Sequence, residues 1–167
     1  MYKVLHSVLD IWSRALALGS VGRSLLLLAI VCLALFQSAK GQDQQYLDSL
    51  KQAVAKEPQD TNTVLGLKKI ANYLRYEDAD EALRYGKRAL ELSAKLHYDR
   101  GIASSYQVVG QCYILESELD SALECFKFGG IHAAKTGIRK SLFQALLNAG
   151  IVYEIQGDYL NSVRVQL

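Results

Sequence analysis

The chain resembles itself at a fixed interval, which runs from Tyr73 to Tyr113 and again from Tyr113 to Tyr153. A small residue follows nine positions after each of these tyrosines. The small residues are Ala82, Ala122 and Ser162. Self-similarity at a period of about 20 to 50 residues is typical of proteins built from stacked structural repeats. The period therefore predicts an array that presents a surface for contact rather than a catalytic centre.

The repeated unit is predicted to be a pair of helices. Half of the residues are hydrophobic and Pro58 is the only proline, which suits a helical protein because proline breaks helix interiors. We expect an all-α fold, an α-solenoid of antiparallel helix pairs. First helices are expected near residues 63–76, 101–116 and 139–156, and second helices near residues 79–96, 119–135 and from 159 onward.

A shorter helix is predicted before the repeats, within a segment of residues 42–60. Residues 44–56 show helical spacing of apolar residues, with Tyr46, Leu47, Leu50, Ala53 and Val54 on one face. The sequence that follows this helix combines Pro58 with several residues that can cap the next helix. We therefore expect a turn there.

A specific motif stands in residues 148–159, whose sequence is N-A-G-I-V-Y-E-I-Q-G-D-Y. It closely resembles the tetratricopeptide repeat (TPR), whose first helix and turn follow the pattern N-L-G-x-x-Y-x-x-x-G-D-Y. The second unit matches at Tyr106, Val109-Gly110, Tyr113, Ala122 and Phe126. The first unit keeps Tyr73, Ala82 and Ala89, but it has Ile70 in place of glycine and Gly86 in place of an aromatic residue.

The resemblance covers residues 61–167, or about two and a half repeats. The units are residues 61–98, 99–137 and a truncated 138–167. The repeat has a period of 40 residues, whereas the standard TPR unit has about 34. This length resembles a variant of the family in which both helices gain roughly one turn.

The resemblance also implies a binding surface, because the first helix of each TPR unit lines the concave side. Carried over by position, this side includes Val64, Leu67, Ala71, Leu74, Arg75, Ser104, Gln107, Gln111, Ile114, Leu115, Gln144, Leu147, Ile151, Glu154 and Ile155. Many of these residues are apolar, so some of them are expected to pack against neighbouring helices instead. The polar members are the predicted partner contacts: Arg75, Ser104, Gln107, Gln111, Gln144 and Glu154. They could equally be ordinary solvent-facing residues.

One activity of the family is not carried over. Chaperone adaptors with TPR units hold a terminal carboxylate with a clamp of lysines and asparagines. The corresponding positions here are Leu67, Ala71, Val108, Gln144 and Asn148. These residues lack the cations of the clamp.

Residues 1–41 are predicted to be a leader that contains a signal peptide. Residues 25–36 form an unbroken apolar run of 12, with Arg23 before it. This run is too short to span a bilayer and fits the apolar region of a secretory signal. We expect cleavage after Gly41 and an extracytoplasmic location, periplasmic or secreted. The stretch before Val21 makes the leader longer than an ordinary signal, so translation is expected to start near Val21; an amphipathic extension is the alternative.

The leader bears on the cysteines, because Cys32 would be removed with it. Cys112 and Cys125 would then lie in an oxidising compartment. We expect them on facing helices, whose axes are typically about 8–10 Å apart, whereas a disulfide needs Cα atoms within about 7 Å. Two buried, unpaired thiols are the predicted outcome, with a disulfide as the alternative.

No catalytic constellation, cofactor motif or metal site is apparent in the sequence. His97 and His132 have no cysteine or carboxylate at metal-ligand spacing, so surface histidines are expected. The leader holds four basic residues and one acidic residue, so the body carries −1 of the formal net charge of +2. That balance disfavours nucleic acid as a partner. We expect a protein without enzymatic activity.

Two functions remain open at this point. The first is an interaction scaffold that binds a protein or peptide. The second is the sensory amino-terminal part of a bacterial signalling protein, a histidine kinase or nucleotide cyclase, which the order of leader, helix, turn and repeats resembles. Membrane contact is expected only through the leader or through a further segment. The third unit has no polar cap, so we expect a fragment of a longer protein or self-association through this unit.

Overall fold

The computed structural model describes residues 24, 28, 43–56 and 58–166. The chain divides into two units, residues 1–46 and 47–167. The predicted apolar region, the cleavage after Gly41, the late start near Val21 and the fate of Cys32 lie almost wholly outside the described residues and stay predictions. Among the residues that are described, no helix has the length and apolar character needed to cross a membrane.

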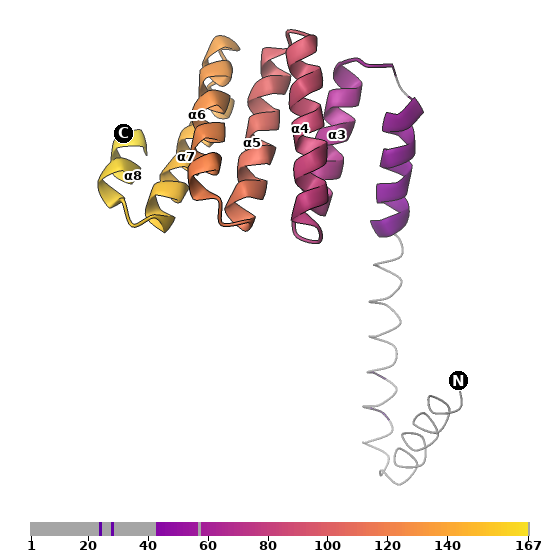
Figure 1. Cartoon of the computed structure of the whole chain (residues 1–167), viewed down its shortest axis with the longest axis horizontal. Helices are drawn as coiled ribbons and strands as arrows, with labels where there is room; N and C mark the ends of the chain where they lie inside the picture. Colours follow the sequence, from indigo (N-terminus) through magenta and orange to yellow (C-terminus); the bar gives the residue numbers. More distant parts are fainter. Residues whose placement is uncertain (1–23, 25–27, 29–42, 57, 167) are drawn as a thin grey trace. The chain divides into compact units, whose positions relative to one another are not determined.

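The second unit contains six labelled helices that follow one another in chain order (Figure 1). They are α3 (Thr61–Leu74), α4 (Ala79–Lys95), α5 (Asp99–Leu115), α6 (Leu119–Lys135), α7 (Arg139–Ile155) and α8 (Tyr159–Gln166). The prediction of an all-α solenoid of helix pairs is confirmed. We call α3, α5 and α7 the A helices, and α4, α6 and α8 the B helices.

The contacts between helices show how the pairs stack. Each helix packs against the next one in the chain, and the A helices also contact one another, α3 with α5 and α5 with α7. Among the labelled helices, no two B helices make such a contact. Because the A layer is drawn together while the B layer is spread, the A helices form the inner layer of this unit.

The period of the sequence is visible in the structure as well. Both α5 and α7 have 17 residues, and they begin at equivalent positions of the repeat, Asp99 and Arg139. Lys87 of α4 lies 5.4 Å from the ring centre of Tyr113, and Lys127 of α6 lies 6.0 Å from that of Tyr153. The two pairs are equivalent, because Lys127 follows Lys87 and Tyr153 follows Tyr113 by one full repeat period. The two tyrosines therefore occupy equivalent places in consecutive units.

The last four turns between the labelled helices repeat at half this period. His97, Ser117, Gly137 and Gly157 each have a positive φ, of 49°, 63°, 69° and 78° respectively. Each follows the end of a helix by one or two residues, where a left-handed residue commonly stops an α-helix. Two of the four turns use glycine, which adopts this conformation without steric cost, and two do not.

The short helix described over residues 43–56 contributes Leu47 and Val54 to the core of the second unit, with Val64, Leu67 and Ile70 of α3. The sequence predicted five apolar residues on one face of this helix. Only part of that face is buried, because Tyr46 and Ala53 are exposed. Asp60 caps α3, as its side chain accepts hydrogen bonds from the backbone N–H groups of Asn62 and Thr63.

Small residues let the helices of a pair approach closely. A Cβ atom on Gly110 would lie 2.8 Å from two ring atoms of Phe126, which is almost fully buried. In the first unit, Gly86 stands where an aromatic residue was expected, and Val109 of the next unit fills the space. A Cβ on Gly86 would lie 3.0 Å from a methyl group of Val109. The departure from the motif is therefore compensated by a neighbouring unit.

Cys112 and Cys125 are free and buried, as predicted. Burial is the main cause that raises the pKa of each thiol, in both cases to about 11. Both cysteines therefore serve as small apolar residues, and Cys112 belongs to the core that α3 and α4 form.

Candidate binding surface on the A helices

Two hollows lie on the A helices, at opposite ends of the same layer. The first, which we call the basic hollow, lies at the amino-terminal ends of the A helices. Its lining residues are Leu65, Lys68, Tyr98, Arg100, Ser104, Gln107, Ile138, Lys140, Ser141 and Gln144. The second, which we call the apolar hollow, lies at the carboxy-terminal ends of the A helices. Its lining residues are Arg75, Tyr76, Gln111, Ile114, Leu115, Asn148 and Ile151.

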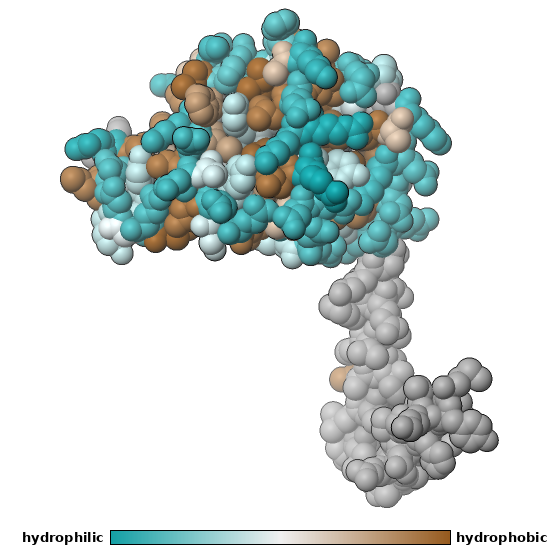
Figure 2. Space-filling model, viewed as in Figure 1, coloured by the Kyte–Doolittle hydropathy of each residue, from teal (hydrophilic) through white to brown (hydrophobic). Residues whose placement is uncertain are grey.

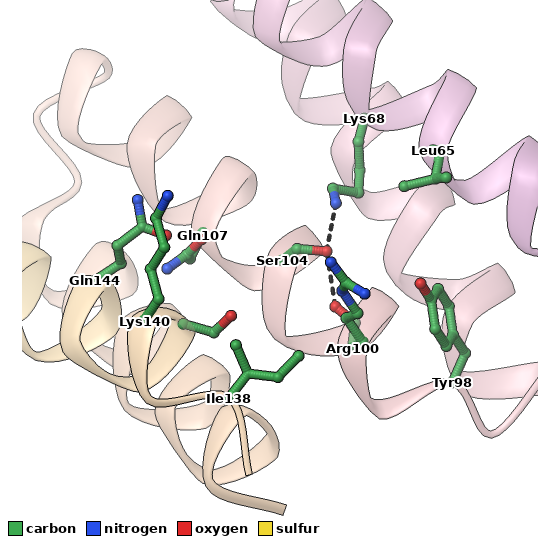
Figure 3. A pocket seen from close by; sticks show the side chains of 10 residues that line it. Leu65, Lys68, Tyr98, Arg100, Ser104, Gln107, Ile138, Lys140 and Gln144 are labelled. Atoms are coloured by element: carbon green, nitrogen blue, oxygen red, sulfur yellow. Dashed lines mark hydrogen bonds between the residues drawn. The ribbon is translucent and has the colours of Figure 1, made fainter. Parts of the chain in front are cut away.

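Three helices each provide one cation to the basic hollow. Lys68 comes from α3, Arg100 from α5 and Lys140 from α7 (Figure 3). Lys68 donates a hydrogen bond to the hydroxyl of Ser104, and this hydroxyl donates to the carbonyl oxygen of Arg100 at 2.8 Å. Ser104 thus holds the Lys68 ammonium near the start of α5, with Arg100 beside it, while Lys140 stands across the open space (Figure 3).

These cations have no counter-ion within the hollow. Among the described residues that line it, none is acidic. The pKa of Lys68 is lowered, first because burial disfavours the charged ammonium and second because Arg100 repels it. Asp99 precedes Arg100 in sequence, but its carboxylate contacts His132 of α6 instead. The hollow therefore carries uncompensated positive charge.

The backbone adds to this positive potential. The amino-terminal ends of α5 and α7 border the basic hollow through Tyr98 and Ile138, which occupy the two N-cap positions. Neither helix has a side-chain hydrogen bond at its cap. The amino-terminal end of a helix carries a partial positive charge, equivalent to roughly half an elementary charge. Both termini therefore favour an anion on the same side as the three cations.

The apolar hollow is different in character. Ile114, Leu115 and Ile151 provide most of its surface, and two of the three are exposed at 39% or more. Arg75 closes one side, since it donates a hydrogen bond to the side-chain oxygen of Gln111 and its guanidinium lies 4.7 Å from the ring centre of Tyr76. The hollow offers an apolar floor with a polar edge.

Five of the six predicted contact residues line one of the hollows. Ser104, Gln107 and Gln144 lie at the basic hollow. Arg75 and Gln111 lie at the apolar hollow. The sixth, Glu154, lines neither of them, because its carboxylate accepts a hydrogen bond from the hydroxyl of Ser162 at 2.9 Å, within its own helix pair. Whether these residues contact a partner stays a prediction.

Some apolar residues of the inner surface were expected to pack against neighbouring helices, and this expectation is confirmed in the first unit. Val64, Leu67, Ala71 and Leu74 are at most 4% exposed and belong to the core between helices. Val108, at a clamp position of the chaperone adaptors, is likewise buried. Helices of this unit are covered on both sides, so the inward stripe of α3 is largely used for packing. The residues carried over by position from the TPR family included this apolar stripe of α3.

Sequence reasoning missed the three cations of the basic hollow. It weighed the net charge of the whole body, which is near zero and conceals a local cluster. One signal was present in the sequence, because Arg100 and Lys140 are separated by one full period and so occupy the same position in consecutive units. Lys68 has no such counterpart among the cations. Its inclusion depends on the stacking of α3 against α5.

The prediction for His132 was also wrong. Its Nδ1 atom lies 2.6 Å from a carboxylate oxygen of Asp99, and its ring stacks at 6.3 Å from that of Tyr106. The carboxylate comes from the preceding helix, 33 residues earlier, beyond any metal-ligand spacing in one helix. In the described part of the chain, no group of three or more potential metal ligands occurs.

Comparisons with known proteins place the fold. No family model and no curated protein matches the sequence. Among solved structures, the chain is similar to TPR-like repeats of a kinesin-light-chain-like protein from Podosopora anserina, with 17% identity and a TM-score of 0.63. That match covers 80% of this chain and 68% of the other. BtubC (BKLC) from P. vanneervenii matches with 19% identity and a TM-score of 0.66, over 80% of this chain and 57% of the other.

These likenesses show that the fold is a TPR-like α-solenoid. At such identities they establish the arrangement of helices and nothing about ligands.

Proposed function

We propose that this protein is an interaction scaffold whose A helices bind an extended segment of a protein or peptide partner. The observation that carries the proposal is the presence of two hollows on one layer, one polar and one apolar, formed by residues from all three A helices. A segment lying across the layer would contact every unit at once. Solvent-exposed apolar residues in one of the hollows give such a segment surface to bury.

The scaffold proposal is tested by selection of binding peptides from a random display library against the immobilised chain. Gln107 is half-buried at the basic hollow, so Gln107→Trp should obstruct the layer and weaken selected peptides at least tenfold. Glu91→Trp on the exposed face of α4 is the matched control and should leave binding unchanged. Peptides that bind both variants equally well would contradict a site on the A helices.

The location of the scaffold is proposed to be extracytoplasmic, on the basis of the leader sequence. Expression of the whole chain in a bacterial host, followed by cell fractionation and amino-terminal sequencing, tests this. Mature protein that begins at Gln42 in the periplasm or medium would support it. A cytosolic protein that begins at Met1 or Tyr2 would contradict both the export and the late start.

The alternative function is that of a sensory region in a bacterial signalling protein. It is supported by the succession of a signal-like leader, a short helix, a turn and 40-residue repeats. The coding DNA beyond codon 167 distinguishes the two functions. An apolar segment of about 20 residues followed by a kinase or cyclase module would favour the sensor.

A further inference from the structure

The basic hollow indicates what kind of segment the A helices bind. The hydroxyl of Ser104 accepts a hydrogen bond from Lys68 and donates one to the backbone carbonyl of Arg100, which keeps the Lys68 ammonium near the start of α5, and Lys140 faces it from α7 (Figure 3). None of the described residues that line the hollow is acidic. A partly buried cation without a counter-ion is costly, and an incoming anion would relieve that cost.

The distribution of the charges favours several carboxylates over one small anion. The cations stand on three different helices, and packed helices are typically about 8–10 Å apart. A single phosphate group could neutralise the pair formed by Lys68 and Arg100 but would leave Lys140 at a distance. Neighbouring acidic side chains on a peptide can reach both sides of the hollow.

The apolar hollow adds a second requirement. Ser104 in the first hollow and Gln111 in the second lie seven positions apart on α5, which corresponds to about 10 Å along the helix. An extended chain covers roughly 3.3 Å per residue, so about three residues span this distance. One segment can therefore place acidic side chains in the basic hollow and a large apolar side chain in the apolar hollow.

We infer that the A helices bind an extended peptide segment in which two or more neighbouring Asp or Glu residues are followed or preceded, about three residues away, by a large apolar residue. This inference rests on the proposed scaffold function and names the chemistry of its ligand. The residues that carry it, Lys68, Arg100 and Lys140, occupy none of the clamp positions compared above.

The test uses peptides selected on the whole chain and blocked by Gln107→Trp. Each is compared with a version in which all Asp and Glu residues are replaced by Asn and Gln. Affinity is measured for the wild type and for Lys68→Gln, Arg100→Gln and Lys140→Gln, with thermal unfolding as a check of folding. Lys69→Gln, an equal loss of charge at an exposed position of α3, is the matched control.

We expect the acidic peptides to bind at least tenfold more weakly to Lys68→Gln and about threefold more weakly to the other two variants, whose cations are more exposed. Lys69→Gln should bind as the wild type does. The neutralised peptides should bind weakly and equally to all variants.

Three results would overturn the inference. Peptides blocked by Gln107→Trp that contain no acidic residues would refute the ligand class and leave the scaffold function intact. Equal binding by Lys68→Gln and the wild type would do the same. Full displacement of an acidic peptide by submillimolar inorganic phosphate would identify a phosphate site instead. If no selected peptide is blocked by Gln107→Trp, the scaffold proposal fails first.

Discussion

The second and third helix pairs follow one template but differ in how much of it is buried. In the pair α5–α6, Val109, Cys112 and Phe126 are at most 2% exposed. In the pair α7–α8, Phe143, Leu160 and Val163 are 56% exposed or more. Apolar side chains reach the surface over α7 and α8 among polar ones (Figure 2).

The difference comes from neighbours rather than from residue type. The pair α5–α6 has α4 packed against one side and α7 against the other. The pair α7–α8 contains a second helix of eight residues where α6 has 17, and a nearly all-apolar hollow between α6 and α7 includes Ile131, Leu142 and Leu146. The same repeat motif therefore gives a buried core or an exposed face, depending on which helices pack against it. The predictions that follow probe this difference, from the largest expected effect to the smallest.

The largest effect is expected for the buried ring of the second pair. Phe126→Ala should lower the free energy of unfolding by about 3–5 kcal/mol, because the ring is lost and a cavity remains. Val152→Ala in the third pair removes less volume and should cost about 2 kcal/mol. Urea denaturation measures both. A cost for Phe126→Ala below about 1 kcal/mol would contradict the packing described for the second pair.

The thiols of the second pair should resist alkylation and disulfide exchange. With pKa values raised from about 9 to about 11 by burial, Cys112 and Cys125 hold about 100-fold less thiolate near pH 8 than free cysteine. Native protein carrying Cys32→Ser should react at least that much more slowly with a disulfide reagent than the same protein in concentrated guanidinium chloride.

The same shift gives a dependence of stability on pH. Both thiols keep their protons more firmly when folded, so this contribution is complete below about pH 9 and is lost as the pH rises towards about 11. Rapid reaction of either thiol in the native protein at about pH 8 would show that the second pair opens locally.

Replacing glycine by alanine should have opposite effects on stability at the α5–α6 contact and at the α6–α7 contact. Gly110→Ala places a methyl group 2.8 Å from the Phe126 ring and should cost about 1–3 kcal/mol through overpacking. Gly130→Ala, where the nearest atom is the Cβ of Ala145 at 3.6 Å, should be neutral or stabilise by up to about 1 kcal/mol through helix propensity. Thermal unfolding distinguishes them, and a destabilising Gly130→Ala would mean that α6 and α7 pack more tightly than described.

Substitutions in the left-handed turns should also have opposite effects on stability, depending on whether the turn already contains glycine. Gly137→Ala and Gly157→Ala should each cost about 1 kcal/mol, because alanine is strained at positive φ. His97→Gly, before the second pair, and Ser117→Gly, in the turn within it, should stabilise by up to about 1 kcal/mol. Unfolding curves of the four variants are the measurement. A stabilising Gly157→Ala would show that the turn before α8 is not left-handed in solution.

The smallest effect on stability is expected at the exposed apolar residues of the third pair. Leu160 is 72% exposed, so Leu160→Ser should change the unfolding free energy by less than about 0.5 kcal/mol. The predicted self-association through this pair should weaken in the same variant. Sedimentation at rising protein concentration tests that, with Glu91→Ser on α4 as control. Equal sedimentation of Leu160→Ser and the wild type would contradict self-association at this place.

The sequence by itself determined the architecture. The spacing of Tyr73, Tyr113 and Tyr153 and the small residues after them located every labelled helix to within two residues, because a stacked repeat must place the same packing residues at the same positions in each unit. The resemblance to the TPR family also pointed to five residues that line the hollows, since the first helix of each TPR unit lines the concave side.

Only the tertiary structure decided which inner residues stay free for a partner and which charges meet. Leu67 and Leu74 share the inner stripe with Arg75, yet two are core and one lines a hollow. Lys68 meets Ser104, and Asp99 meets His132, across 36 and 33 residues of sequence. Such contacts depend on the offset between neighbouring helices. Periodicity gives the order of helices, whereas packing gives their offset.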